Sequence, residues 1–144
     1  MIVDENEIAH QVIGMAIEVH KTIGPGLPKD IYLQCLAYDL SQNGLLVNTD
    51  KILPIQYKGL NMESGYSVDL LVEDRLIVSI ETTDSVSDSQ IQKCLRMLRL
   101  GNYKLGLVIN FNSSLLKNGI RRVTNNRNNL EEERNLESGI SSYQ

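Results

Sequence analysis

The sequence predicts an α/β domain with a mixed central sheet of about four strands flanked by helices, in the order α-α-β-β-β-α-β. Three observations lead to this prediction. Residues 5–22 carry apolar side chains at helical spacing, residues 66–80 hold two apolar runs around a polar turn, and residues 104–111 form a further apolar run. We expect one domain over residues 1–124 and a polar, flexible tail over residues 125–144.

Two helices are expected at the start of the chain. Asp4 followed by Glu7 is a start signal for the first helix, and Gly24-Pro25-Gly26 ends it sharply. His20, near the end of this helix, fits a capping or packing role. The second helix should run from about Pro28 to Gln42, with Pro28 in its first turn and four residues on one buried face: Ile31, Cys35, Leu36 and Leu40.

A β-hairpin is expected in the middle of the chain. Two apolar runs, Tyr66–Val72 and Leu76–Ile80, flank the polar residues Glu73-Asp74-Arg75. Both runs are too apolar for a half-solvated sheet, so other elements should cover both faces. Residues 45–58 predict a preceding strand that Pro54 interrupts, which fits an edge position or a bulge.

The length of the hairpin turn decides which side chains share a face. A three-residue turn pairs Val72 with Leu76, which sets Asp69 opposite Ser79 and puts Glu81 one step further along the same face. A two-residue turn would shift the register and send Asp69 to the other face. We predict the three-residue turn.

A third helix and a final buried strand should follow the hairpin. Ser87 and Gln90 make a capping box, so the helix should start near Asp88. Lys104–Phe111 should be a strand reached by a parallel crossover, and residues 113–124 hold a short further element. On the helix, three residues should face the core (Ile91, Leu95 and Leu98) and three should lie nearest the hairpin acids (Gln90, Lys93 and Met97).

Composition limits the classes of function. The 144 residues are 42% hydrophobic and carry a net charge of −4, with a pI near 5.2, which argues against indiscriminate binding to phosphate backbones. Cys35 and Cys94 fall among apolar residues and predict buried free thiols. No run has the apolar length of a signal peptide or a membrane span, so we expect a cytoplasmic protein with no membrane contact.

Five segments in order carry a family pattern. They are V-H-K-T-I-G-P-G-L at 19–27, Y-x-x-C-L-A-Y-D-L at 32–40, Y-K-G-L at 57–60, G-Y-x-x-D-L-L-V-E-D at 65–74 and R-L-G-N-Y-K-L-G-L-V-I-N-F-N at 99–112. Over roughly residues 5–123 the chain thereby resembles the small bacterial family of GxxExxR proteins, within the PD-(D/E)xK nuclease superfamily. The resemblance implies a restriction-endonuclease-like core and, in active relatives, Mg²⁺ held between the hairpin Asp and the Glu of an E-x-K triplet.

This chain departs from that pattern at five of the six active-site positions that the resemblance implies. Asp69 keeps the hairpin Asp, whereas Ser79 stands at the Glu position and Glu81 at the Lys position of E-x-K. Lys29 replaces an upstream helical Glu, and the H-x-x-Q pair of the third helix is replaced by two residues, Gln90 and Lys93. We expect no catalytic residue among the six positions.

Charge explains why these substitutions matter. Asp69 and Glu81 against Lys29 and Lys93 sum to zero, so a divalent cation is no longer needed there, and we expect no cofactor. We hypothesise an internal ion-pair network that links the second helix, the hairpin and the third helix, in which the reversals at Lys29 and Glu81 complement each other. Two alternatives remain: each charged group is an ordinary solvated residue, or Asp69 and Glu81 still bind a metal weakly.

Three functions follow from these patterns. The leading hypothesis is a non-catalytic nuclease-like domain that binds nucleic acid, a partner protein or another copy of itself. The second is an active Mg²⁺-dependent DNA or RNA nuclease with relocated ligands such as Asp30, Asp69 and Glu81, and the third is a structural or inhibitory decoy of an active relative. Six basic residues are candidates for phosphate contacts, although the acidic balance weakens their field: Arg96, Arg99, Lys104, Lys117, Arg121 and Arg122.

Overall fold

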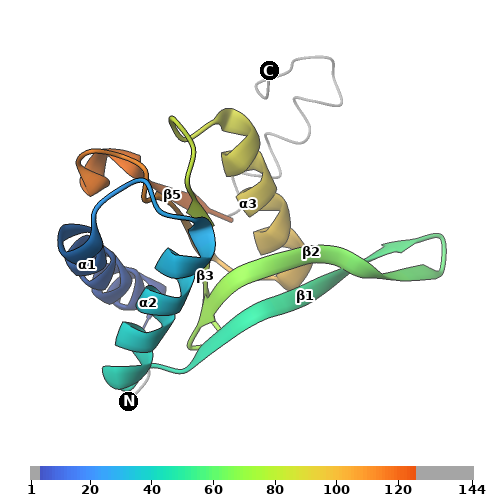
Figure 1. Cartoon of the computed structure of the whole chain (residues 1–144). Helices are drawn as coiled ribbons and strands as arrows, with labels where there is room; N and C mark the ends of the chain where they lie inside the picture. Colours follow the sequence, from blue (N-terminus) through green and yellow to red (C-terminus); the bar gives the residue numbers. More distant parts are fainter. Residues whose placement is uncertain (1–3, 126–144) are drawn as a thin grey trace.

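A computed structural model describes residues 4–125 of the chain (Figure 1). Its central sheet has five strands in the order β1-β2-β3-β4-β5, with β3 and β4 parallel and the other neighbours antiparallel. The elements are α1 (Glu5–Ile23), α2 (Lys29–Gln42), β1 (Val47–Tyr57), β2 (Leu60–Val72), β3 (Leu76–Glu81), α3 (Asp88–Gly101), β4 (Leu105–Asn110), the 3₁₀ turn η1 (Leu116–Gly119) and β5 (Ile120–Thr124).

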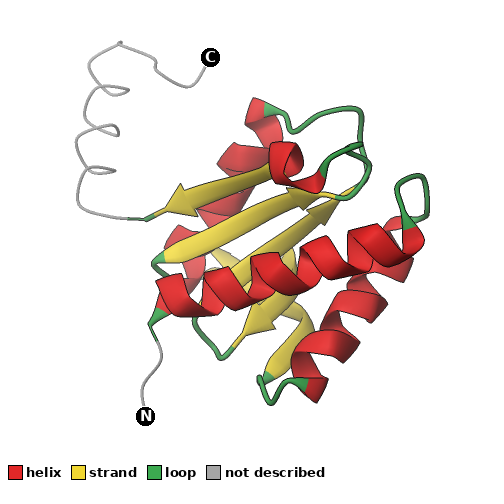
Figure 2. Ribbon diagram, turned by 90° about the vertical axis from the view of Figure 1, so that its left-hand side faces the viewer, coloured by secondary structure: helices red, strands yellow, loops and turns green. Residues whose placement is uncertain are grey.

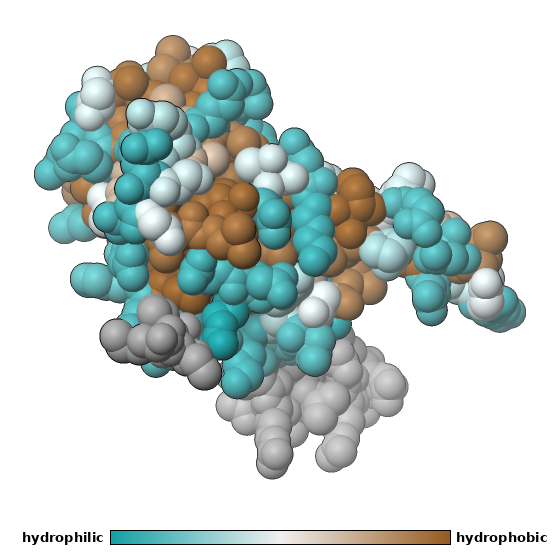
Figure 3. All heavy atoms as spheres, turned by 90° about the horizontal axis from the view of Figure 1, so that it is seen from below, coloured by the Kyte–Doolittle hydropathy of each residue, from teal (hydrophilic) through white to brown (hydrophobic). Residues whose placement is uncertain are grey.

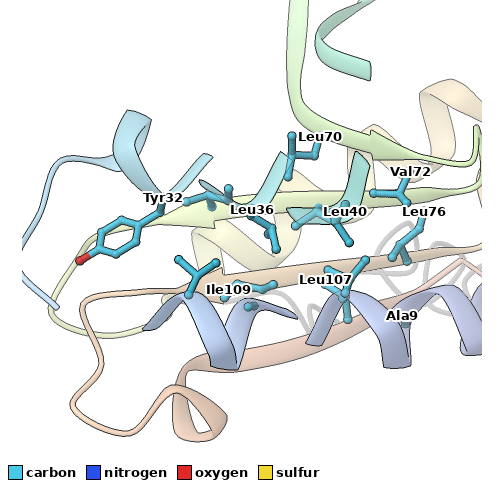
Figure 4. Packing of buried hydrophobic residues seen from close by; sticks show 14 of the residues in the cluster. Ala9, Tyr32, Leu36, Leu40, Leu70, Val72, Leu76, Leu107 and Ile109 are labelled. Atoms are coloured by element: carbon cyan, nitrogen blue, oxygen red, sulfur yellow. The ribbon is translucent and has the colours of Figure 1, made fainter. Parts of the chain in front are cut away.

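Helices cover both faces of the sheet, as Figures 1 and 2 show. α1 and α2 pack on one face around Leu70, Val72 and Leu107, and this larger core is drawn in Figure 4. α3 packs on the other face, where Cys94 and Leu98 meet Ile77. Every residue of β4 is buried, as is nearly all of β3, which confirms that these apolar runs lie inside a covered sheet.

The α/β class with a mixed sheet is confirmed, and the sheet has five strands where about four were predicted. The last segment forms β5, a fifth strand antiparallel to β4, instead of an undefined short element. β5 is a short edge strand in which only Val123 is buried and Ile120 is half-buried. Its arginines face solvent, so it lacks the apolar pattern that marks a buried strand.

The predicted hairpin register is confirmed. Val72 pairs with Leu76, and the turn between them contains two residues with positive φ, Glu73 (55°) and Asp74 (52°). The β1–β2 pairing is longer than predicted, because β2 begins at Leu60. Its register shifts between Leu53 and Ile55, so Pro54 lies at an irregularity of an edge strand, as predicted.

The helix starts agree with their sequence signals, but the buried face of α2 does not. The Asp4 side chain caps α1, and Ser87 with Gln90 forms the predicted capping box of α3. On α2, Ile31 is 40% exposed and Tyr32 is buried in its place, so the prediction for Ile31 was wrong. Tyr32 is buried because its hydroxyl forms hydrogen bonds to the turn before α2, which helical spacing alone does not reveal.

Several further expectations can be compared with the described residues. Pro28 is the residue before the first turn of α2 and not within it. Cys35 and Cys94 are both free, Cys94 buried and Cys35 half-buried. No helix within residues 4–125 has the length and hydropathy that a membrane crossing needs. The tail predicted for residues 125–144 lies, apart from Asn125, outside the described residues.

Candidate functional site

A tyrosine fixes the turn that places Lys29. The Tyr32 hydroxyl donates a hydrogen bond to the Gly24 carbonyl at 2.6 Å and accepts one from the Leu27 N–H at 3.1 Å. Its ring is stacked on Phe111, with 4.5 Å between the ring centroids. These bonds hold the turn between α1 and α2 to the first residues of α2. They thereby fix the orientation of Lys29, the first residue of α2.

Lys29 points to the hairpin and pairs with Asp69. Lys29 Nζ lies 2.9 Å from Asp69 Oδ1, and the Asp69 side chain is 15% exposed. The other carboxylate oxygen, Asp69 Oδ2, accepts a hydrogen bond from the Ile80 N–H at 2.8 Å. Both carboxylate oxygens of Asp69, the residue that keeps the hairpin Asp of the resemblance, thus already accept from protein donors.

Ser79, which the resemblance places at the glutamate position of E-x-K, lies in an apolar setting. Ser79 is 6% exposed, and its hydroxyl is buried without a regular hydrogen-bond partner. The Cys94 thiol of α3 lies beside it, and the Ser79 hydroxyl can donate to the Cys94 sulfur. Burial raises the pKa of Cys94 to about 12; the Ser79 contact lowers this pKa and the Glu81 charge raises it. Ser79 offers a hard cation one neutral oxygen at most.

Glu81 is half-buried at the end of β3, and the charges around it act on its pKa. Burial raises the pKa of Glu81 above its ordinary value; Lys29 and Lys93 act to lower it, and Asp69 acts to raise it further. Within residues 4–125, no ion pair shorter than 4 Å includes Glu81 or Lys93. Of the predicted ion-pair network, the structure has a direct contact between Lys29 and Asp69, while the Lys29 charge acts on Glu81 through space.

Gln90 caps the start of α3. Its amide oxygen accepts from the Ser87 N–H at 3.0 Å, which closes the capping box, and its amide nitrogen donates to the Thr83 hydroxyl at 3.1 Å. The fully buried Asn110 holds the same loop: it accepts from the Thr83 N–H and donates to the Thr83 carbonyl. Gln90 has thus the structural role that its capping signal predicts.

A polar pocket of about 590 Å³ opens over the Lys29–Asp69 pair. Lys93 of α3 lines it, as expected for the face of α3 nearest the hairpin. Asp30 and Asp50 also line it, and sequence reasoning missed Asp50, which adopts a positive φ of 56° inside β1. The charge count of zero therefore holds for the four family positions, while the pocket walls carry three carboxylates and two ammonium groups.

The donor set does not fit a catalytic magnesium ion. Mg²⁺ needs near-octahedral oxygen ligands, usually with carboxylates facing the ion. Within residues 4–125, no three His, Cys, Asp or Glu side chains are placed to share a metal. Asp69 faces an ammonium group 2.9 Å away, and Asp30 accepts a hydrogen bond from Gln34, so the relocated set with Glu81 is not assembled.

The candidate phosphate-binding residues are scattered. Arg96 and Arg99 line a groove between α3 and the β1–β2 hairpin, and Lys104, three residues beyond the C-terminal end of α3, lines a different pocket beside the β2–β3 turn. Arg121 donates to backbone carbonyls, and Arg122 donates to Asn6 of α1. Lys117 is on η1. The six residues do not form one continuous basic surface.

Comparison with known protein families matches residues 6–123 to the PD-(D/E)XK nuclease superfamily. A search of curated proteins and a search of solved structures gave no match. The family match covers well over half of the chain, and the mixed sheet flanked by three helices is consistent with a restriction-endonuclease-like fold. This chain therefore belongs to the PD-(D/E)XK nuclease superfamily.

Proposed function

We propose that this chain is a non-hydrolytic member of the superfamily, akin to the GxxExxR proteins, that acts by binding a protein partner. The observation that carries the proposal is the 2.9 Å contact between Lys29 Nζ and Asp69 Oδ1. An ammonium group takes the position next to the hairpin carboxylate where an active relative would place Mg²⁺. It supplies the positive charge without the Lewis acidity that activates water.

The neighbouring positions support the same proposal. Ser79 and Glu81 provide neither the second carboxylate at the usual place nor the lysine of an E-x-K triplet. Displacing the Lys29 ammonium would leave Mg²⁺ with Asp69, because the other two carboxylates of the pocket, Asp30 and Asp50, are not placed to share a metal with it among the described residues. One carboxylate is too little to offset the dehydration of this ion. The scattered basic residues and the net charge of −4 favour a protein over a nucleic acid as the partner.

A metal titration tests the loss of hydrolysis. We would titrate Mg²⁺ and Mn²⁺ by calorimetry into the natural chain and into a triple variant, Lys29→Glu, Ser79→Glu and Glu81→Lys. The triple variant should bind Mn²⁺ at least tenfold more tightly, because it regains two carboxylates facing Asp69. Lys104→Gln, which makes the same net change in charge far from the pocket, should behave like the natural chain.

Cleavage assays complete the test. The natural chain should leave plasmid DNA and RNA intact in 10 mM Mg²⁺ or Mn²⁺, and circular dichroism should show that the triple variant is folded. Metal-dependent cleavage by the natural chain that is lost in Asp69→Asn would overturn the proposal in favour of an active nuclease. Equal Mn²⁺ affinity of the natural chain and the triple variant would overturn the electrostatic reasoning.

A further inference from the structure

A further pocket lies where α1 and α2 run side by side (Figures 1 and 2). This α1–α2 pocket has a volume of about 410 Å³ and shares no lining residue with the polar pocket over the Lys29–Asp69 pair. Pockets of this volume with mainly apolar walls are typical of sites for small organic molecules. The residues of its own walls therefore decide what it can hold.

The walls of the α1–α2 pocket are mainly apolar. Val19 and Ile23, one turn apart on α1, form one side, and Cys35 and Tyr38 of α2 form the other. Ile31, one turn before Cys35, continues the apolar stripe of α2. Tyr38 is 64% exposed and Ile31 is 40% exposed, so α2 turns two large apolar side chains towards solvent. An apolar body held between the helices would bury part of this stripe.

Among the described residues, one charged side chain lines the α1–α2 pocket, and it is a carboxylate, Asp39. No ion pair shorter than 4 Å within residues 4–125 includes it. The lysine of α2, Lys29, is held by Asp69, and Lys21 of α1 lies about 200° around the helix from Val19. Asp39 also lies in the last turn of α2, where the helix dipole adds negative potential. The pocket therefore has a negative charge beside an apolar wall.

The two neutral polar residues of the pocket each donate a hydrogen bond within their own helix. The Thr22 hydroxyl donates to the Glu18 carbonyl, and the Gln34 amide nitrogen donates to the Asp30 carboxylate. Each of the two residues has thereby used a donor, and its oxygen remains as an acceptor beside Asp39. A ligand with a positive charge and hydrogen-bond donors fits these groups, whereas a carboxylate or a phosphate does not.

We propose that the α1–α2 pocket binds a free organic amine, with the ammonium group at Asp39 and the apolar body between the two helices. The Tyr38 ring is open to a cation–π contact, because among the described residues no lysine or arginine lies over it. A lysine of a partner protein carries the same ammonium group, but its four-carbon stem would fill only part of this pocket. An amine with an aromatic body fills it better. This site and the protein partner proposed above do not depend on each other.

Matched compounds test the class of ligand. 4-Phenylbutylamine, 4-phenylbutanol and 4-phenylbutyrate share one apolar body and differ in the charge at its end. Titrated into the natural full chain and followed by two-dimensional NMR, the amine should bind with a dissociation constant below about 1 mM and shift the amides of Thr22, Ile23 and Gln34. The alcohol and the carboxylate should each bind at least tenfold more weakly. Nα-acetyl-lysine methylamide, which represents a lysine of a partner protein, should also bind at least tenfold more weakly.

A pair of variants locates the ammonium group. Asp39→Asn should weaken the binding of 4-phenylbutylamine at least tenfold. This variant should fold, because a negative charge in the last turn of a helix opposes the helix dipole and its removal does not destabilise the helix. Asp84→Asn makes the same change of charge at a different pocket and should leave the affinity within twofold. Far-UV circular dichroism checks the fold of both variants.

Cys35 provides a second readout, because it lines the α1–α2 pocket while Cys94 is fully buried. At about five times its dissociation constant for the natural chain, 4-phenylbutylamine should slow the reaction of Cys35 with Ellman's reagent about fourfold, and less than twofold in Asp39→Asn. No binding of the amine at about 10 mM, equal affinities for the amine and the alcohol, tighter binding of the lysine compound, or an unchanged affinity of Asp39→Asn would each overturn the proposal.

Discussion

Replacing Lys29 by methionine tests the central ion pair through the sign of the change in stability. Lys29 is the first residue of α2, where a positive charge meets the positive end of the helix dipole. An ordinary solvated lysine there is unfavourable, so its removal would stabilise the protein by about 0.5 kcal/mol. If the contact with Asp69 stabilises the fold, the same substitution must destabilise it.

The structure sets the expected magnitude. Two unit charges 2.9 Å apart attract by about 1.4 kcal/mol at the dielectric constant of water. The Lys29 side chain is 43% exposed, which keeps screening high, whereas Asp69 is only 15% exposed, which strengthens the pair. After the cost of ordering the lysine and the relief of the dipole, Lys29→Met should lower the free energy of unfolding by about 1 kcal/mol. The melting temperature should fall by about 3 °C.

The other ion pair of the described residues is a matched control. Lys51 is 42% exposed, like Lys29, but its partner Asp74 is 68% exposed and lies 3.9 Å away. Lys51→Met should therefore change stability by less than about 0.5 kcal/mol. Urea unfolding followed by far-UV circular dichroism measures both variants. A Lys29→Met protein as stable as the natural chain, or more stable, would refute a structural role for the pair.

Three further predictions concern the same region. Because burial raises the pKa of Glu81, the stability that this group contributes is present below about pH 4 and is lost as the pH rises through the folded-state pKa. In urea unfolding, Glu81→Gln should therefore be more stable than the natural chain at pH 7, and this difference in stability should vanish at pH 3.5. With its pKa near 12, the Cys94 thiol is ionised in only about one molecule in ten thousand at pH 8, so Ellman's reagent should modify only Cys35 until urea unfolds the protein, and Cys35→Ser should give no native signal. A Cβ atom at Gly106 would lie 2.7 Å from Cys94 Sγ, so Gly106→Ala should cost about 1–3 kcal/mol of stability in urea unfolding, much of it recovered by adding Cys94→Ala.

Local patterns predicted the scaffold of the site well. The capping signals at Asp4 and Ser87 act within four residues, and the three-residue turn before Leu76 fixes the register of the hairpin by itself. Because the side-chain period of a strand is two, this register was enough to place Asp69 and Ser79 on one face. Such features need no knowledge of distant contacts.

Features that depend on distant contacts were missed. The partner of Lys29 is set by the direction of the first turn of α2, which the bonds of Tyr32 to the preceding turn determine. Asp50 enters the pocket because of an irregular backbone conformation within β1, and its sequence neighbours give no sign of it. The length of the β1–β2 hairpin, whose outer end projects from the domain in Figures 1 and 3, was missed because residues 56–64 are all exposed, whereas the prediction rested on the buried runs Tyr66–Val72 and Leu76–Ile80.

The groove beside α3 and the polar pocket share one lining residue. Tyr66 lines both the pocket over the Lys29–Asp69 pair and the groove beside α3. A protein partner bound in that groove would therefore lie next to the Lys29–Asp69 pair, where we expect an active relative to admit its substrate. An active enzyme must keep this entrance open for a nucleic acid, whereas the non-hydrolytic domain that we propose here has no such requirement. If Lys29 stands where a relative holds its metal, as we propose, the adjoining groove is available to a protein partner.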